Sequence, residues 1–307
     1  MYLGIDTSNY TTSLALFDGE HMLQKKRVLT VKKGERGLRQ SDAVFQHTVN
    51  MPQLFDELDF ASPLKAVGVS IRPRSVEGSY MPCFLVGKNV ATAVSKTSGV
   101  PLYQTSHQVG HILASLYSAG RLDLINERFI AFHLSGGTTE ALLVTPDKDD
   151  VVRCELVACS NDLKAGQVVD RTGVLLGMDF PCGKELDAVS NESDREFKLK
   201  PSMQGLNCSL SGVENKVKKM IADGESDADV ARFALSSISV AVVEMAKRTA
   251  KEYGNLPVVF SGGVSSNSLL RKTVAENFDA YFAQSEFSLD NAAGTAVYAY
   301  LKNEKMI

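Results

Sequence analysis

The sequence predicts an α/β protein with two related mixed-sheet domains that face a cleft, because one structural pattern occurs in both halves of the chain. A strand, a polar turn and a second strand open the chain, and the same unit returns near residue 129. Helices and apolar strands alternate after each unit, and 307 residues suffice for two domains that each bury a core. We expect one lobe at residues 1–128 plus 293–307 and the other at 129–292.

The first half opens with a hairpin whose strands are Tyr2–Asp6 and Ser13–Phe17, joined by the polar turn Thr7–Thr12. Ser106 is suited to cap a later helix, since its hydroxyl can accept a bond from a free N–H of the first turn. Periodicity and capping residues predict helices at about 41–58, 84–98 and 106–119 and strands at 66–71 and 101–105.

The second half repeats the pattern, with strands expected at 129–134, 140–145 and 257–261. Ser135–Thr139 is the polar turn between the first two of these strands. Apolar residues recur at helical spacing from Val230 to Met245, which predicts an amphipathic helix before the last strand. The segment 191–210 lacks clear periodicity and is expected to be an ordered loop or an insertion.

Composition narrows the class of protein. The net charge of −3 gives no general attraction to nucleic acid or membrane. No stretch reaches the roughly 18 apolar residues of a membrane helix, and the N-terminus predicts a strand instead of a signal peptide. The five cysteines form no C-x-x-C pair, as expected of reduced thiols. We therefore expect a cytoplasmic protein without a membrane segment.

Two histidines suggest a metal site. His107 and His111 are four residues apart at the start of a predicted helix, so both imidazoles lie on one face, one turn apart. The alternative is a pair of ordinary helix histidines. Position 108 is Gln, so the glutamate base of a zinc protease is missing. His133 ends the strand that enters the second polar turn, which places three of the five histidines near the predicted cleft.

Glycine-rich corners are candidates for binding an anion or a nucleotide. In the turn Ser135–Thr139, Gly136 and Gly137 let backbone N–H groups approach an oxyanion, and the hydroxyls add donors. The alternative is a plain hairpin turn. The segment Ser261–Asn267 runs from a strand through two glycines into a helix, and such a corner presents N–H groups to a nucleotide. The alternative is a tight joint between strand and helix, in which Asn267 only caps the helix.

Three acids complete the set of candidates. Asp170 and Asp187 follow glycine-containing segments and are able to accept hydrogen bonds from ribose hydroxyls. Each has a simpler reading as a cap or a surface acid. Asp290 precedes an alanine-rich helix and is either an N-cap or a carboxylate ligand of the kind that accompanies two histidines in metal sites.

Taken in order, these motifs resemble the TsaD family, the threonylcarbamoyl transferases of tRNA, over almost the whole chain. The opening Gly4–Ser8 resembles the family's G-I-E-T-S, and His107–His111 resembles its H-x-x-G-H. The other matching segments are 135–139, 166–170, 177–183, 209–212, 262–267 and 290–293.

The resemblance implies a fold and a reaction. The fold is the duplicated actin/Hsp70/sugar-kinase class (ASKHA, ribonuclease H-like), with mixed-sheet domains around a nucleotide cleft. The reaction moves a threonylcarbamoyl group from threonylcarbamoyl-AMP to N6 of adenosine 37 of tRNA. It also implies a small TsaB-like partner protein on the N-terminal lobe.

The resemblance also assigns residues. His107, His111 and Asp290 would hold one divalent ion, Fe²⁺ or Zn²⁺, and His133 is a possible further ligand. The phosphate or carbamoyl end of the intermediate would lie against the turn, where N–H groups stabilise charge developing on oxygen. That set consists of His133, Leu134, Ser135, Gly136 and Gly137, of which the last three are the expected catalytic groups. The adenosine would be held by Asp170, Gly183, Asp187 and Asn267.

Several positions depart from the family pattern. The family's opening motif continues C-D-E-T, whereas this chain has Asn9–Thr12 without any acid. Glu140 replaces a glutamine, Cys182 replaces a glycine, and Glu214 replaces a lysine. Binding residues are kept better than those around the reacting group, which indicates a diverged paralogue. Two alternatives therefore stay open: a metal-dependent carbamoyl transferase with another acceptor, and a non-catalytic nucleotide-binding regulatory subunit.

Overall fold

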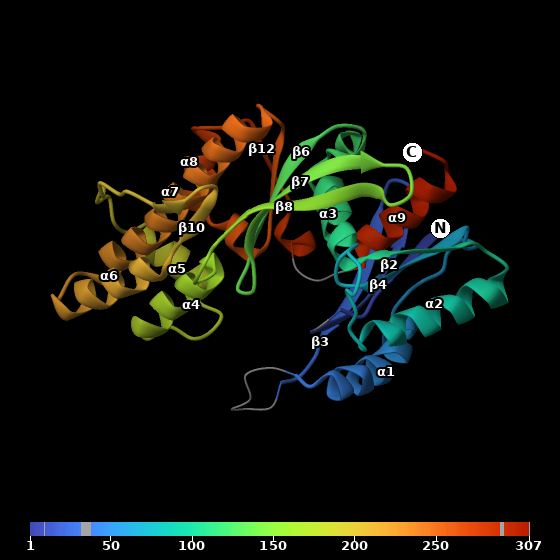
Figure 1. Cartoon of the computed structure of the whole chain (residues 1–307). Coiled ribbons are helices and arrows are strands. Elements are labelled where there is room, and N and C mark those ends of the chain that lie inside the picture. The colour runs from blue at the N-terminus through green and yellow to red at the C-terminus, as the bar shows by residue number, and fades with distance from the viewer. Residues whose placement is uncertain (9, 32–37, 289–291, 307) are drawn as a thin grey trace. The chain divides into compact units, whose positions relative to one another are not determined.

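The computed structural model describes residues 1–8, 10–31, 38–288 and 292–306. The chain divides into two compact units (Figure 1). The first contains Met1–Glu127, Thr145–Cys154 and Glu286–Ile307, and the second contains Arg128–Val144 and Glu155–Ser285. These units differ from the lobes expected from the sequence at residue 128, at 145–154 and at 286–292, and the lobes themselves stay a prediction.

A five-stranded sheet forms the centre of the first unit, in the order β3-β2-β1-β4-β5. β1 pairs antiparallel with β2 and parallel with β4, β2 pairs antiparallel with β3, and β4 pairs parallel with β5. The strands are β1 (Tyr2–Asp6), β2 (Thr11–Phe17), β3 (Met22–Val28), β4 (Ala66–Arg72) and β5 (Leu102–Ser106). Every residue of β1 and β2 is buried, so this sheet is covered on both faces.

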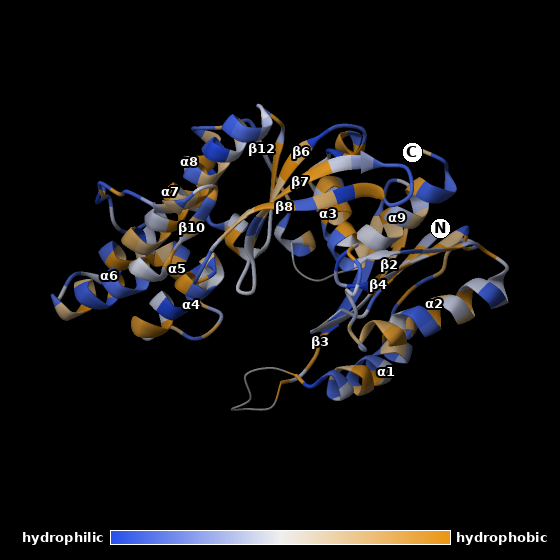
Figure 2. Cartoon of the chain, viewed as in Figure 1, coloured by the Kyte–Doolittle hydropathy of each residue, from blue (hydrophilic) through white to orange (hydrophobic). Residues whose placement is uncertain are grey.

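Helices of the first unit cover the sheet with apolar residues, and in Figure 2 both α1 and α2 carry hydrophobic as well as hydrophilic residues. On one side, Leu54 of α1 and Ala91 of α2 join a core with Ile5 and Leu14. The helices are α1 (Gln40–Asp56), α2 (Phe84–Ser98), α3 (His107–Ser118), η1 (Leu122–Asn126) and α9 (Ala293–Asn303). α9 lies close against β1 and β4, because a Cβ on Gly4 or Gly68 would overlap its backbone.

The second unit repeats this sheet. Its order is β12-β11-β6-β7-β8, which read from β8 matches the first sheet strand for strand. β6 pairs antiparallel with β7 and parallel with β11, and β11 pairs parallel with β12. The strands are β6 (Phe129–Leu134), β7 (Thr139–Asp147), β8 (Val151–Cys159), β11 (Val258–Ser261) and β12 (Ala280–Phe282). The predicted duplication of mixed-sheet domains is confirmed.

Stacked aromatic rings and one long helix hold the core of the second unit. Phe132, Phe260 and Phe282 stack across β6, β11 and β12, with successive ring centroids 4.9 and 5.2 Å apart. The predicted amphipathic helix is α7 (Asp227–Tyr253), with Gly254 at its C-cap. The other elements are α4 (Ala165–Leu175), α5 (Gly183–Ser190), β9 (Ser202–Gln204), β10 (Asn207–Ser209), α6 (Ser211–Ala222), η2 (Gly263–Ser266), α8 (Ser268–Ala275) and η3 (Ser285–Phe287).

The segment 191–210 carries the small hairpin β9–β10, which the sequence did not predict because three-residue strands are too short to show periodicity. Along the described ranges, the chain forms no helix that is both long enough and apolar enough to cross a membrane.

Candidate functional site

The histidine pair lies in the first turns of α3. Ser106 is the N-cap, and its side chain accepts a hydrogen bond from Val109 N at 3.2 Å, as expected of a capping serine. The ring centroids of His107 and His111 are 4.2 Å apart, with an interplanar angle of 73°. The spacing of four residues has therefore brought the two imidazoles together on one face.

A buried carboxylate lies behind the first histidine. Asp6, the last residue of β1, is 1% exposed, and its Oδ2 is 2.8 Å from His107 Nδ1. Ser70 Oγ donates to the same oxygen at 2.7 Å, and Ser8 N donates to Oδ1 at 2.8 Å. Burial by itself raises the pKa of Asp6, but the charge and hydrogen bond of His107, with the two other donors, outweigh it and lower the pKa. The carboxyl is therefore ionised near neutral pH.

A second feature of the first unit is the close packing of α9 on α3. A Cβ on Gly294 would overlap the backbone of Gly110, which lies between the two histidines in sequence. Just before α9, Ala292 N donates to Ser13 Oγ at 2.7 Å. The first turn of α9 is thus fixed beside the histidine-bearing part of α3. Any residue larger than glycine at position 294 would separate the two helices, whereas a Cβ on Gly110 would make an ordinary contact with Thr295 at 3.6 Å.

In the second unit, the polar turn between β6 and β7 rests on the start of a helix. Ser135 N donates to Thr138 O at 2.7 Å, and Thr138 N donates to Ser135 Oγ at 3.1 Å, which closes the turn. A Cβ on Gly166, in the first turn of α4, would come within 2.5 Å of Gly136 N. Gly136 and Gly137 are exposed. Exposed backbone at a helix N-terminus is an arrangement suited to binding an anion.

The end of β11 lies beside this turn. Gly262 has φ +88, and a Cβ there would overlap the backbone of Leu134, so only glycine fits. His133 Nδ1 is 3.1 Å from Ser261 Oγ, its direct partner on the parallel strand β11. Glu140 lies opposite His133 on the antiparallel strand β7. The three residues therefore form a polar row across β11, β6 and β7, on one face of the sheet.

Two of the four residues expected to hold the adenosine contact each other. Asp187 accepts hydrogen bonds from Asn267 Nδ2 at 2.7 Å and from Ser268 Oγ at 2.8 Å and N at 3.1 Å. Asn267 Oδ1 in turn accepts from Leu270 N at 2.9 Å and caps α8. The carboxylate of Asp187 thus organises the N-terminus of α8, and the capping alternative for Asn267 is confirmed, while its contact with adenosine stays a prediction.

The other two residues lie together at the start of α5. Asp170 Oδ1 accepts a hydrogen bond from Cys182 N at 3.0 Å, which ties α4 to the loop that precedes Gly183. Gly183 begins α5 and is exposed. The thiol of Cys182 is buried, and burial, followed by the charge of Asp170, raises its pKa. This cysteine is therefore a packing residue at neutral pH.

Comparison with known proteins identifies the family. A sequence model of TsaD, described as tRNA N6-adenosine threonylcarbamoyltransferase, matches residues 40–297. The chain belongs to the TsaD family. A relative of this name from Thermosipho africanus (strain TCF52B) is 30% identical, over 99% of this chain and 95% of its own length. The resemblance predicted from the motifs is confirmed.

Solved structures of other proteins share the fold. HypF, in a phosphate- and nucleotide-bound form, has a TM-score of 0.61 and 14% identity, covering 99% of this chain and 55% of its own length. A ROK family glucokinase from Streptomyces griseus, in complex with glucose and AMPPNP, has a TM-score of 0.51 and 13% identity, covering 98% of each chain. At such identities the likeness concerns the fold alone. The predicted sugar-kinase-like fold class is confirmed.

The TsaD resemblance implies a divalent ion, and the donor set of the first unit fits one. Two imidazoles on one helix face, one of them backed by a carboxylate, are typical ligands of zinc or iron. The third predicted ligand, Asp290, lies outside the described residues. Within the ranges that the structure describes, no group of three or more His, Cys, Asp and Glu could hold a metal.

Asp6 is the residue of this site that sequence reasoning missed. It belongs to the segment that resembles the opening motif of the TsaD family, yet it received no role. The available signal was an acid at the end of a fully apolar strand, since a buried carboxylate requires partners.

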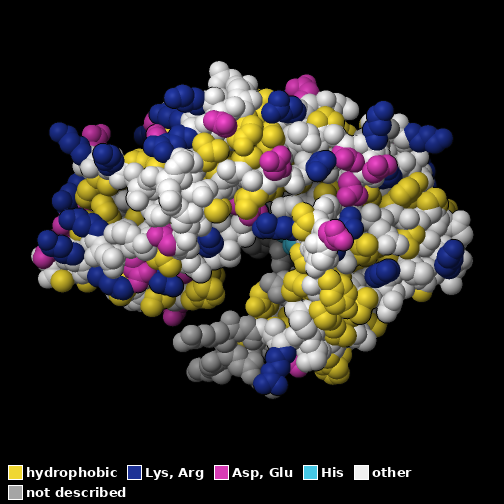
Figure 3. All heavy atoms as spheres, viewed as in Figure 1, with side chains coloured by type: hydrophobic (Ala, Val, Ile, Leu, Met, Phe, Trp, Pro, Cys, Tyr) yellow, Lys and Arg dark blue, Asp and Glu magenta, His cyan; other side chains and the backbone are white. Residues whose placement is uncertain are grey.

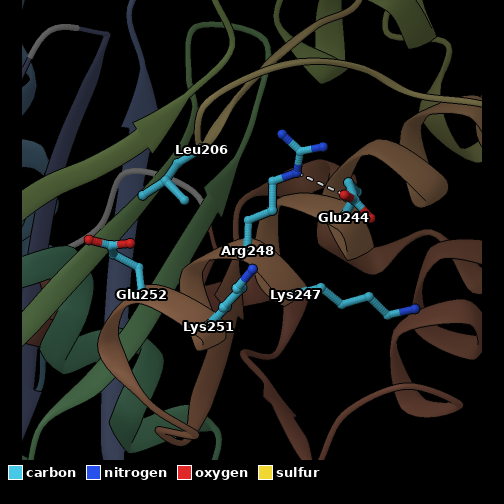
Figure 4. Close-up of a pocket in the computed structure, with 6 residues that line it drawn as sticks. All are labelled: Leu206, Glu244, Lys247, Arg248, Lys251 and Glu252. Carbon is cyan, nitrogen blue, oxygen red and sulfur yellow. Dashed lines mark hydrogen bonds and ion pairs between the residues drawn. The ribbon is translucent and has the colours of Figure 1, made fainter.

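A groove on α7 lies apart from all the predicted site residues (Figure 4). It has a volume of about 520 Å³. Arg248 donates to Glu244 Oε1 at 2.8 Å and to Gly205 O at 2.8 Å. Its positive charge is therefore partly neutralised by Glu244. Both cations and anions line the groove, whose residues are Leu206, Glu244, Lys247, Arg248, Lys251 and Glu252. It lacks the uniform charge of a phosphate site.

Proposed function

We propose that this chain transfers a threonylcarbamoyl group from threonylcarbamoyl-AMP to N6 of adenosine 37 of tRNA. The observation that carries the proposal is the TsaD family match over residues 40–297. That range includes every predicted site residue, and the groups it contributes are those that an acyl-adenylate requires. They are an anion-binding turn, a carboxylate–amide pair and two imidazoles.

The second unit supplies the contacts for the adenylate. The N–H groups of the exposed residues Gly136 and Gly137 would bind the phosphate or the carbamoyl oxygen, and the packing of Gly166 against Gly136 would hold the turn in place. Asp187 and Asn267, held together at the start of α8, would accept and donate hydrogen bonds at the ribose. Asp170 and Gly183 would help to hold the adenosine by fixing the loop between α4 and α5.

The first unit would contribute the metal ligands His107, His111 and Asp290. A bound Fe²⁺ or Zn²⁺ ion would polarise the carbamoyl carbonyl or hold the phosphate. In the transfer, the N6 nitrogen bonds to the carbamoyl carbon and gives up one proton to water, the bond from that carbon to the phosphate oxygen breaks, and AMP leaves. The N–H groups of the turn would stabilise the charge that develops on oxygen.

The test is complementation of a strain that lacks its own TsaD, followed by mass analysis of tRNA nucleosides. We expect the wild-type chain to restore the modified adenosine, His111→Ala to abolish it and Gly212→Ala to leave it unchanged. Gly212 serves as the control because a Cβ there meets nothing within 4 Å. A folded, metal-loaded wild-type protein that restores no modification would contradict the proposal.

A second candidate is carbamoyl transfer to a different acceptor. The specific observation in its favour is the described stretch Tyr10–Thr12, which lacks the acids that the family has near the reacting group. Its β2 part is fully buried, with Thr12 Oγ1 bonded to His47 Nδ1 at 2.8 Å. In the same complementation strain, adenylate turnover without tRNA modification would favour this candidate.

An apolar surface on the first unit suits a TsaB-like partner. Phe45 and Val49, one turn apart on α1, are 68% and 45% exposed, and Leu85 at the start of α2 is 42% exposed. Hydrophobic side chains gather over these two helices in Figure 3. Neighbouring exposed apolar side chains of this kind mark protein interaction sites.

The partner proposal is tested by titrating a TsaB-like protein onto purified chain. We expect the double variant Phe45→Ser, Val49→Ser to weaken binding by about 10-fold or more, since large apolar anchors dominate interface energies. The matched control is Val174→Ser in α4 of the second unit, where the valine is 55% exposed. Equal affinity of the double variant and wild type would exclude this surface.

A further inference from the structure

A carboxylate that no proposed step uses is buried beside the predicted metal ligands. Asp6 is 1% exposed, its two oxygens accept hydrogen bonds from Ser8 N and Ser70 Oγ, and Oδ2 lies 2.8 Å from His107 Nδ1. Ser8 and Ser70 lie on the two sides of Asp6, after β1 and in β4. Together they fix the plane of the carboxylate, so that Oδ2 is directed at the imidazole of His107.

This arrangement determines where the proton of the imidazole lies. An ionised carboxylate only accepts hydrogen bonds, so the ring must donate from Nδ1. The lone pair of the neutral imidazole is then on Nε2, and the ring cannot rotate without breaking the bond to Asp6. Metal-binding histidines are oriented in this way by carboxylates in other proteins.

We propose that Asp6 is the positioning residue of the metal site, which sets the tautomer and the ring orientation of His107. The inference rests on the proposed metal binding by His107 and His111, and it adds a residue from β1 to the proposed function. Asp6 does not touch the metal, because both of its oxygens are engaged by the protein. If Asp6 had only a structural role, a change in the tautomer of His107 would not change the affinity for the metal.

The critical variant is Asp6→Asn. The amide oxygen can accept from Ser8 N, which leaves the NH₂ group facing His107 Nδ1 and Ser70 Oγ. Since an amide NH₂ only donates, the ring must accept at Nδ1 and carry its proton on Nε2. The variant therefore reverses the tautomer and blocks the nitrogen that would bind the metal, with almost no change in volume.

The first measurement uses metal-free protein with ¹⁵N-labelled histidine rings, read by long-range nitrogen–proton spectra. We expect His107 to carry its proton on Nδ1 in wild type and on Nε2 in Asp6→Asn. Asp6→Glu, which keeps a carboxylate, should retain the wild-type tautomer. Ser70→Ala is the matched control, because it removes a donor from the same oxygen and leaves the bond to His107. The same tautomer in wild type and Asp6→Asn would overturn the inference.

The second measurement is Zn²⁺ affinity by competition with a chelator. We expect Asp6→Asn to bind Zn²⁺ about 10–100-fold more weakly than wild type, the range found when such supporting groups are removed. Asp6→Glu should recover most of this loss, and Ser70→Ala should lose less than Asp6→Asn. Unchanged affinity in Asp6→Asn, with the reversed tautomer present, would also overturn the inference.

The two proposals fail in different ways. Wild-type protein that binds no Zn²⁺ but shows the Nδ1–H tautomer would contradict the metal part of the proposed function and support the control of His107 by Asp6. Wild-type protein that binds Zn²⁺ with the opposite tautomer would leave the metal site standing and remove Asp6 from it.

Discussion

The two hairpins that open the two units have the same topology and opposite chemistry. β1–β2 and β6–β7 occupy the same place in sheets with the same strand order. The last paired residues before the turn are Asp6 and Ser13 in the first hairpin, and Leu134 and Thr139 in the second. The first therefore ends on a buried charge, and the second ends on an apolar residue that leads into exposed glycines.

The difference shows that the duplicated fold fixes positions, and that the residues at the strand ends decide the chemistry. In the first unit we expect a side chain to supply the contacts, since Asp6 Oδ2 lies 2.8 Å from Nδ1 of His107 on α3. In the second unit we expect the backbone to supply them, since Gly136 and Gly137 are exposed and Gly136 packs against the start of α4. Side-chain ligands suit a cation and backbone N–H groups suit an anion. The predictions below separate these two halves.

Removal of either imidazole should have the largest effect. We expect purified wild-type protein to contain about one divalent ion per chain and His107→Ala or His111→Ala to contain almost none, because a site with few protein ligands cannot lose one of its imidazoles. Elemental analysis by mass spectrometry measures the content. His21→Ala is the control, since His21 is exposed and outside the site. If both variants had the metal content of wild type, the proposed metal site of the first unit would be wrong.

Acid should destabilise the first unit through a different histidine. His47 on α1 is fully buried, and its Nε2 has no hydrogen-bond partner among the described residues. Burial lowers the pKa of His47 to about 4, from 6.5, although the charge of Asp6 opposes the shift. Between these values the unfolded chain binds a proton that the folded chain does not bind. Stability is thus complete above pH 6.5 and falls as the pH approaches 4.

The expected loss from this one group is about 3 kcal/mol between pH 7 and pH 4. Chemical denaturation at the two pH values measures the free energy of unfolding, and hydrogen exchange shows whether the first unit opens first. His47→Asn is the informative variant, because Asn keeps a polar atom near Thr12 Oγ1 and does not titrate. If His47→Asn loses as much stability in acid as wild type, another group is responsible.

The fold and the histidine pair could be predicted because their signals are local. A spacing of four residues on a helix face places His107 beside His111 whatever the rest of the chain does. Each strand–turn–strand unit shows in fewer than 20 consecutive residues. The family motifs then implied a duplicated fold, and the matching strand order of the two sheets confirms it.

The remaining features could not be predicted because they depend on long-range packing. Asp6 and His107 are 101 positions apart in sequence, and only the pairing of β1, β4 and β5 brings the end of β1 to the start of α3. Asp187 was expected to bind the ribose or to act as a cap or surface acid, and its bond to Asn267, which spans 80 positions, was not foreseen. No periodicity or spacing reports which side chains fill such contacts. The assignment of site residues to ligands stays a prediction.

A substitution at Gly166 should disturb the second half of the comparison. In Gly166→Ala the new Cβ would come within 2.5 Å of Gly136 N, so the turn must move away from α4. We expect a loss of about 1–3 kcal/mol in stability, as for other overpacked sites. We also expect weaker binding of ATP or an acyl-adenylate, measured by calorimetric titration, with an unchanged metal content. Gly212→Ala is the control, and a variant that binds nucleotide as wild type does would separate the turn from the nucleotide.

The smallest effect is expected in the groove on α7, which tests whether function is confined to the two hairpins. Lys247→Ala and Lys251→Ala remove cations from a surface where Glu244 and Glu252 offset most of the positive charge. Substitutions at such exposed positions usually change stability by less than about 0.5 kcal/mol. We expect thermal denaturation, nucleotide affinity and tRNA affinity to stay close to wild type. If tRNA affinity alone falls and its salt dependence weakens, these lysines contact phosphates, and the second unit then has a binding surface remote from its turn.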